Sequence, residues 1–201
     1  MKNALKLSLV LGSLFILYLI LGVVNYFYAL PAFYAYSIVG GILTLLFYSI
    51  LLQNAASSSP LKWPLISLVG MGVLSLVNDG LITAINLKPV VDEQSYQAYI
   101  ELFKWYKVIY VLSMVLTAIG YVWFGLFFKK GSVVQISAFL IPVILVADFI
   151  WAKLNSVLFT DYSDIIENEQ IRMLSVGVIF NTCKTIFYYS FYKYNQSYGR
   201  N

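Results

Sequence analysis

The chain has 201 residues, of which 61% are hydrophobic and only 11% are charged. An ordinary soluble domain is about 45–50% apolar and about 25% charged, so this chain has too few polar side chains to cover a soluble surface. The composition excludes a soluble globular enzyme, a disordered chain and a secreted disulfide scaffold, and it predicts an integral membrane protein.

Residue types that are missing or rare narrow the chemistry further. The sequence has no histidine and one cysteine, Cys183. Without histidine, Ser-His-Asp catalysis and HExxH zinc sites are excluded. We expect Cys183 to be a small buried residue of a membrane helix. The sequence contains no glycine-rich phosphate-binding motif, and a net charge of +4 is not typical of nucleic-acid binding. We therefore expect a non-enzymatic protein without cofactor, metal or nucleic-acid partner.

Six segments are long and apolar enough to cross a bilayer, which takes roughly 20 residues of helix. In chain order they are residues 5–24, 33–52, 63–84, 105–128, 133–152 and 173–192. The first follows Lys2 and Lys6, as a signal peptide would, but its apolar stretch exceeds the usual length of about 7–15 residues. We interpret it as a retained helix that forms a tight hairpin with the second. The predicted fold is all-α, a polytopic membrane protein with six transmembrane helices.

Charged residues outside the spans differ between the two sides of the predicted membrane. With a cytoplasmic N-terminus, the cytoplasmic segments carry only bases, namely Lys2, Lys6, Lys62, Lys129, Lys130, Lys193 and Arg200. The external loops and helix ends carry Lys88, Lys104, Lys107, Lys153 and Arg172, and also Asp92, Glu93, Glu101, Asp161, Asp164, Glu167 and Glu169. This positive-inside bias predicts a multi-pass protein of the inner (cytoplasmic) membrane with both termini in the cytoplasm.

The third and fifth spans have similar sequences. Residues 76–79 read Leu-Val-Asn-Asp before Asn86, and residues 145–148 read Leu-Val-Ala-Asp before Asn155 at the same spacing. A repeat of two helical hairpins would produce this pattern; the alternative is chance similarity between two helices rich in Leu and Val. In either case, residues 1–58 form an N-terminal transmembrane hairpin added to a four-helix unit of residues 59–201.

Three charged residues lie inside the predicted spans: Asp79, Asp148 and Lys184. Charge in the hydrocarbon region costs about 2.5–3.5 kcal/mol even on translocon scales, so such residues usually face the bundle interior or a cavity. Helical spacing places Asp79 on one stripe with Gly72, Ser75, Thr83 and Asn86, and aligns Asp148 with Asn155. We therefore predict an intramembrane polar cluster of Asp79, Asp148, Asn181 and Lys184.

Other arrangements of these charges remain open. The residues could pair only to lock the helices together, or they could extend toward the membrane surfaces. Lys107 and Arg172, near the external helix ends, are competing partners for the two aspartates.

From about residue 60 onward, short motifs match a known family pattern. They are Leu-Lys-Trp-Pro-Leu at 61–65, Gly-Met-Gly-Val-Leu-Ser at 70–75, the lysine-rich turn at 124–130 and the aromatic-then-basic ending at 188–198. With these the chain resembles domain-of-unknown-function family 2569, small polytopic membrane proteins of bacteria. It departs from the pattern at Leu76, where the family has proline, and in its added N-terminal hairpin. The resemblance implies a four-helix inner-membrane unit and implies no activity.

Three functions are compatible with these features. The first is a non-enzymatic membrane protein that acts by association with itself or with a partner membrane protein. The second is a small transporter or channel with a path lined by Asp79, Asp148, Asn181 and Lys184. The third is a membrane accessory protein of a phage-defence system, such as a type VI CRISPR locus. Polar stripes that converge on a cavity would favour transport, whereas a dry and fully paired cluster would favour association.

Overall fold

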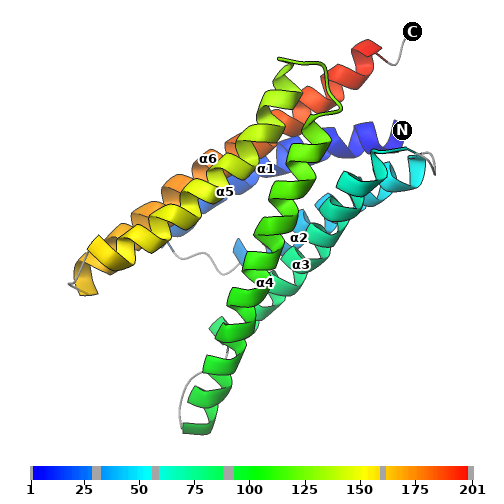
Figure 1. Cartoon of the computed structure of the whole chain (residues 1–201). Coiled ribbons are helices and arrows are strands. Elements are labelled where there is room, and N and C mark those ends of the chain that lie inside the picture. The colour runs from blue at the N-terminus through cyan, green and yellow to red at the C-terminus, as the bar shows by residue number, and fades with distance from the viewer. Residues whose placement is uncertain (1, 29–32, 56–58, 88–92, 159–161, 199–201) are drawn as a thin grey trace.

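The computed structural model describes residues 2–28, 33–55, 59–87, 93–158 and 162–198. Within these ranges the chain forms six helices and no strand, which confirms the all-α prediction (Figure 1). The helices are α1 (Lys2–Tyr28), α2 (Phe33–Asn54), α3 (Lys62–Leu87), α4 (Glu93–Gly125), α5 (Val133–Leu158) and α6 (Tyr162–Tyr198).

Four helices among the described residues are long and apolar enough to cross a membrane. The qualifying stretches are Asn3–Val24 in α1, Lys62–Ala84 in α3, Ser95–Gly125 in α4 and Val133–Leu154 in α5. α2 has a shorter apolar stretch, Ile38–Asn54. The 37 residues of α6 would extend about 55 Å, but they include the polar run at 181–185. A membrane protein is therefore supported, while six spans and the orientation of the termini stay predictions.

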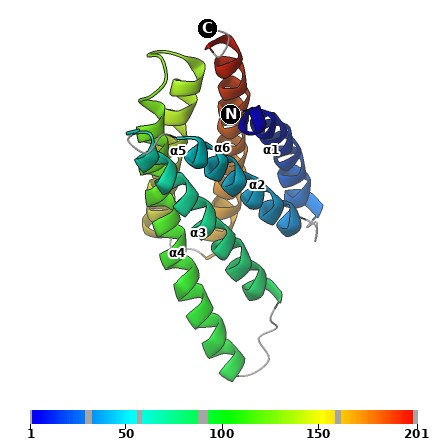
Figure 2. The ribbon, with the colours of Figure 1, turned by 90° about the vertical axis from the view of Figure 1, so that its right-hand side faces the viewer.

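The helices form a ring. Each helix packs against its neighbours in the chain, and α6 closes the ring against α1; no other pair of helix backbones is in contact in the described ranges. We call the end where α1, α3 and α5 finish the outer end, and the opposite end the inner end. Toward the outer end, α3 and the first half of α4 diverge from α5 and the first half of α6 (Figures 1 and 2).

α4 and α6 start earlier than their predicted spans. α4 begins at Glu93, so residues 93–104, which lie outside the predicted span of residues 105–128, continue that helix outward. Along this extension the rings of Tyr99, Phe103, Tyr106 and Tyr110 stack in sequence, with centroids about 6 Å apart. Aromatic residues three or four apart lie on one face of a helix, so this stack stabilises the extension where it leaves the predicted hydrocarbon region.

A dense group of aromatic side chains fills the inner half of the ring. We call it the aromatic plug; its members, all buried, are Phe47, Tyr48, Tyr121, Phe124, Phe187, Tyr188 and Phe191. Most neighbouring rings meet edge to face with centroids 5–6 Å apart, which is the preferred geometry of aromatic pairs. The hydroxyl of Tyr48 donates a hydrogen bond to that of Tyr121 at 2.7 Å. The plug thus joins α2, α4 and α6 across the centre of the ring.

Candidate functional site

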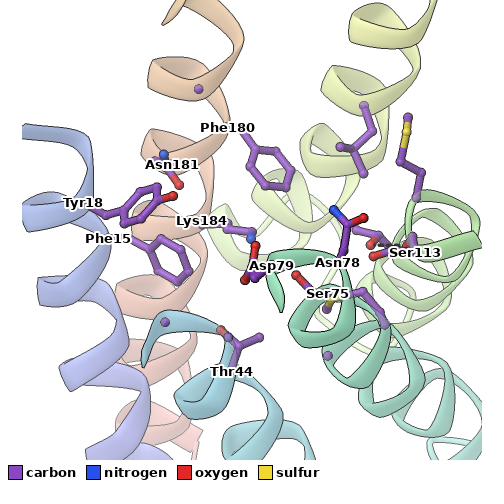
Figure 3. A pocket seen from close by; sticks show the side chains of 18 of the residues that line it. Phe15, Tyr18, Thr44, Ser75, Asn78, Asp79, Ser113, Phe180, Asn181 and Lys184 are labelled. Atoms are coloured by element: carbon purple, nitrogen blue, oxygen red, sulfur yellow. Dashed lines mark hydrogen bonds between the residues drawn. The ribbon is translucent and has the colours of Figure 1, made fainter. Parts of the chain in front are cut away.

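A cavity of about 370 Å³ lies within the ring on the outer side of the aromatic plug. All six helices contribute to its lining (Figure 3). Its size falls within the range of about 300–1,000 Å³ that is usual for small-molecule sites. Apolar atoms make up most of its lining, to which hydroxyls, amides and two charged groups also contribute.

The charged groups of the lining are Asp79 on α3 and Lys184 on α6. Their side chains point toward one another across the cavity (Figure 3), and the charge of Asp79 acts on the Lys184 ammonium. Protein atoms surround Lys184, yet its side chain keeps some accessible surface because it lines the cavity. Opposite charges held together in this way compensate one another where water is scarce.

Aromatic rings also surround the Lys184 ammonium. Its nitrogen lies 4.3 Å from the centroid of the Phe180 ring and 4.9 Å from that of Phe15. Both distances are within the roughly 6 Å over which a ring face attracts a cation. Phe15 in turn stacks on Tyr188 of the plug, with centroids 5.6 Å apart. Through Phe15, the aromatic rings around the Lys184 ammonium are thus in direct contact with the aromatic plug.

The predicted polar stripe of α3 reaches the cavity in part. Gly72, Ser75 and Asp79 line it, as their helical spacing predicts. Thr83 is not among the lining residues; its hydroxyl donates a hydrogen bond to the backbone oxygen of Asp79 at 2.7 Å. The side chains of Asn86 and Asn155, also predicted to belong to the polar face, lie outside the described residues.

Asn78 is a cavity residue that the sequence did not single out. It lines the cavity beside Asp79, and its buried side-chain oxygen has no hydrogen-bond partner among the described residues. A buried acceptor without a donor costs about 1–3 kcal/mol. The only signal in the sequence was the neighbouring acid, since Asn78 falls outside the narrow stripe that spacings of three and four define.

Asp148 has different neighbours from Asp79. It forms an ion pair with Arg172 of α6, and it accepts a hydrogen bond from the Tyr110 hydroxyl at 3.2 Å. Asp148 is not among the cavity residues, although Tyr110 is. Asn181 lines the cavity with Lys184. The structure therefore brings three of the four predicted cluster residues to the cavity and places Asp148 in an adjoining pair with Arg172.

Lys107, the other competing base, points to a ring instead. Its nitrogen lies 4.5 Å from the centroid of the Phe103 ring, and its side chain is exposed.

Within the described ranges, no group of three or more His, Cys, Asp or Glu side chains could hold a metal ion. No family model, curated protein or solved structure matches the chain.

Proposed function

We propose that the protein is a non-enzymatic carrier that moves a small polar solute across a membrane, with the outer cavity as its binding site. The observation that carries the proposal is the convergence of the polar faces of α3 and α6 on an open volume. Side chains that served only to hold these helices together would favour direct contact, because every polar group left facing a void in hydrocarbon costs free energy. The cost is offset when the void receives a solute that bonds to those groups.

The aromatic plug favours a carrier over a channel. Fully buried rings such as Tyr48, Tyr121 and Phe187 occupy the ring between the cavity and the inner end. A solute in the cavity therefore requires a rearrangement to continue inward. The least extensive backbone contacts in the ring are those of α1 with α2 and of α4 with α5. These two interfaces separate α1, α5 and α6 from α2, α3 and α4. Rocking of one group of helices against the other would open the inner end.

Cysteine labelling tests whether the cavity is accessible from outside. The natural Cys183 is buried, so Cys183→Ala provides a cysteine-free background. In it, Ser75→Cys reports on the cavity, and Val77→Cys reports on the outward surface of the same helix. We expect a charged methanethiosulfonate added outside to modify Ser75→Cys and to spare Val77→Cys, because a thiol in lipid does not ionise. Protection of Ser75→Cys from both sides in a folded protein would contradict the proposal and favour association with a partner protein or a second copy.

Filling the cavity tests whether it carries flux. A side chain added at Gly177 would extend into open space, since no atom beyond the adjoining turns of its own helix lies within 4 Å of the position that a β-carbon would take. The same holds for Gly80, which is exposed on the surface of α3 and provides a matched control. In proteoliposomes we expect Gly177→Leu to abolish the uptake of labelled small polar solutes, screened as a set of sugars, polyols and amino acids, and Gly80→Leu to retain it. Equal flux in the two variants would exclude the cavity as the path.

A further inference from the structure

We infer that the cavity binds a zwitterion of the α-amino acid type, with its ammonium group at the α3 wall and its carboxylate at the α6 wall. The inference rests on the proposed function, because it names the class of solute that the carrier moves. It is drawn from the distribution of acceptors, donors and charge over the two walls (Figure 3).

The α3 wall presents hydrogen-bond acceptors. Asp79 supplies a carboxylate, and the adjacent Asn78 supplies a buried side-chain oxygen that has no donor among the described residues. An ammonium group carries three N–H donors and a positive charge, so it can bond to the Asp79 carboxylate and, once the Asn78 side chain turns toward the cavity, to that oxygen as well.

The α6 wall presents a positive charge and an amide. Lys184 supplies an ammonium group, which can donate three hydrogen bonds and accepts none. Asn181 lies one helical turn earlier, and its amide can donate two more. A carboxylate between them would form charge-assisted hydrogen bonds, which are about twice as strong as neutral ones. The two walls thus recognise opposite ends of one small molecule.

Charge balance distinguishes a zwitterion from other polar solutes. Among the described residues of the lining, Asp79 and Lys184 are the charged groups, so the lining is neutral. A solute with one charge would take one of them as its partner and leave the other uncompensated in a medium of low dielectric constant. A zwitterion inserted between them gives each group a new partner of opposite charge. A neutral solute could form hydrogen bonds with both groups but would bring no opposite charge to either.

Matched solutes test the inference on the purified full-length protein. The common α-amino acids are screened first by thermal stabilisation. The best binder is then compared with the amine that lacks its carboxylate, the acid that lacks its amino group, and the amide of that acid. For leucine these are 3-methylbutylamine, 4-methylpentanoate and 4-methylpentanamide. We expect each analogue to bind about 10-fold to 100-fold more weakly, because each lacks at least one charge-assisted contact.

Variants connect this preference to the two walls. Asp79→Asn and Lys184→Gln each remove one charge. The double variant removes both and leaves neither uncompensated, so we expect it to fold, which the same thermal assay checks. We expect the double variant to bind the amino acid and its analogues with similar low affinity. Lys107→Gln, which removes an exposed base outside the cavity, is the matched control and should bind as the wild type does.

The outcomes separate this inference from the proposed function. If Ser75→Cys is labelled from outside and Gly177→Leu stops flux, but no amino acid binds more tightly than its analogues, the zwitterion inference is overturned and transport stands. If, in addition, Ser75→Cys is not labelled and Gly177→Leu does not reduce flux, both the zwitterion inference and the carrier proposal are overturned. Tight binding that survives in the double variant would equally overturn the assignment to Asp79 and Lys184.

Discussion

Separating Asp148 from Arg172 tests whether this ion pair locks α5 to α6. The two side chains are only 9% and 11% exposed, so neither charge is well solvated when its partner is removed. Asp148→Asn keeps the shape of the side chain and removes only its charge. Loss of one partner of a buried pair costs about 3–5 kcal/mol. For a chain of this length, each kcal/mol shifts the melting temperature by roughly 2–4 °C, so we expect a decrease of roughly 6–20 °C.

Thermal or detergent-induced unfolding of the purified protein measures this change. Asp148→Asn combined with Arg172→Gln removes both charges and should recover most of the lost stability, because no charge is then left without a partner. Tyr110→Phe, which removes only the hydrogen bond to Asp148, should cost no more than about 1.5–3 kcal/mol. An unfolding midpoint of Asp148→Asn equal to that of the wild type would refute the idea that the ion pair holds α5 to α6. A double variant as unstable as the single one would refute it as well. Loss of solute binding in the folded double variant would show that Asp148 also belongs to the binding site.

Two further substitutions test the packing around the cavity. Tyr48→Phe leaves the buried hydroxyl of Tyr121 without its 2.7 Å partner, and we expect unfolding measurements to show a loss of about 1–3 kcal/mol. Gly120→Ala places a β-carbon 2.6 Å from the buried Leu68 side chain, so either that side chain or the two helices must shift, at a cost of about 1–3 kcal/mol. Gly80→Ala meets no atom within 4 Å and should instead stabilise its helix by up to about 1 kcal/mol, which makes it the control for the same assay.

The elements and one face of the site could be predicted because they depend on local spacing. Residues three and four apart lie on the same side of a helix wherever that helix packs, so Gly72, Ser75 and Asp79 reach the cavity together. The partner of each charge could not be predicted in this way. Whether Lys184 or Arg172 meets a given aspartate depends on the rotation and separation of the helices, and these are set by packing over their whole length.

The aromatic plug was equally inaccessible from the sequence. The chain has 14 phenylalanines and 17 tyrosines, and apolar rings are acceptable both in lipid and in the core of a membrane protein. Phe187 is fully buried, whereas Phe127 and Phe149 are exposed, although all three fall inside the predicted spans. In a soluble protein the hydrophobic pattern would separate these classes, because exposed positions would be polar. In this chain that contrast is missing, and only the three-dimensional structure distinguishes the plug from the outer surface.

The different bases that accompany the two aspartates fit different roles. Arginine carries a planar, delocalised charge with five donors in fixed directions, which suits a permanent contact such as that of Arg172 with Asp148. Lysine carries a compact charge on a flexible stem, so its ammonium can leave one partner and accept another at little geometric cost. Lys184 lies beside a cavity where such an exchange has room, and the rings of Phe15 and Phe180 can stabilise its charge while it moves. The similar sequences around Asp79 and Asp148 therefore do not imply similar functions. In the proposed carrier, the base that each acid meets determines whether the acid holds two helices together or exchanges its partner for a solute.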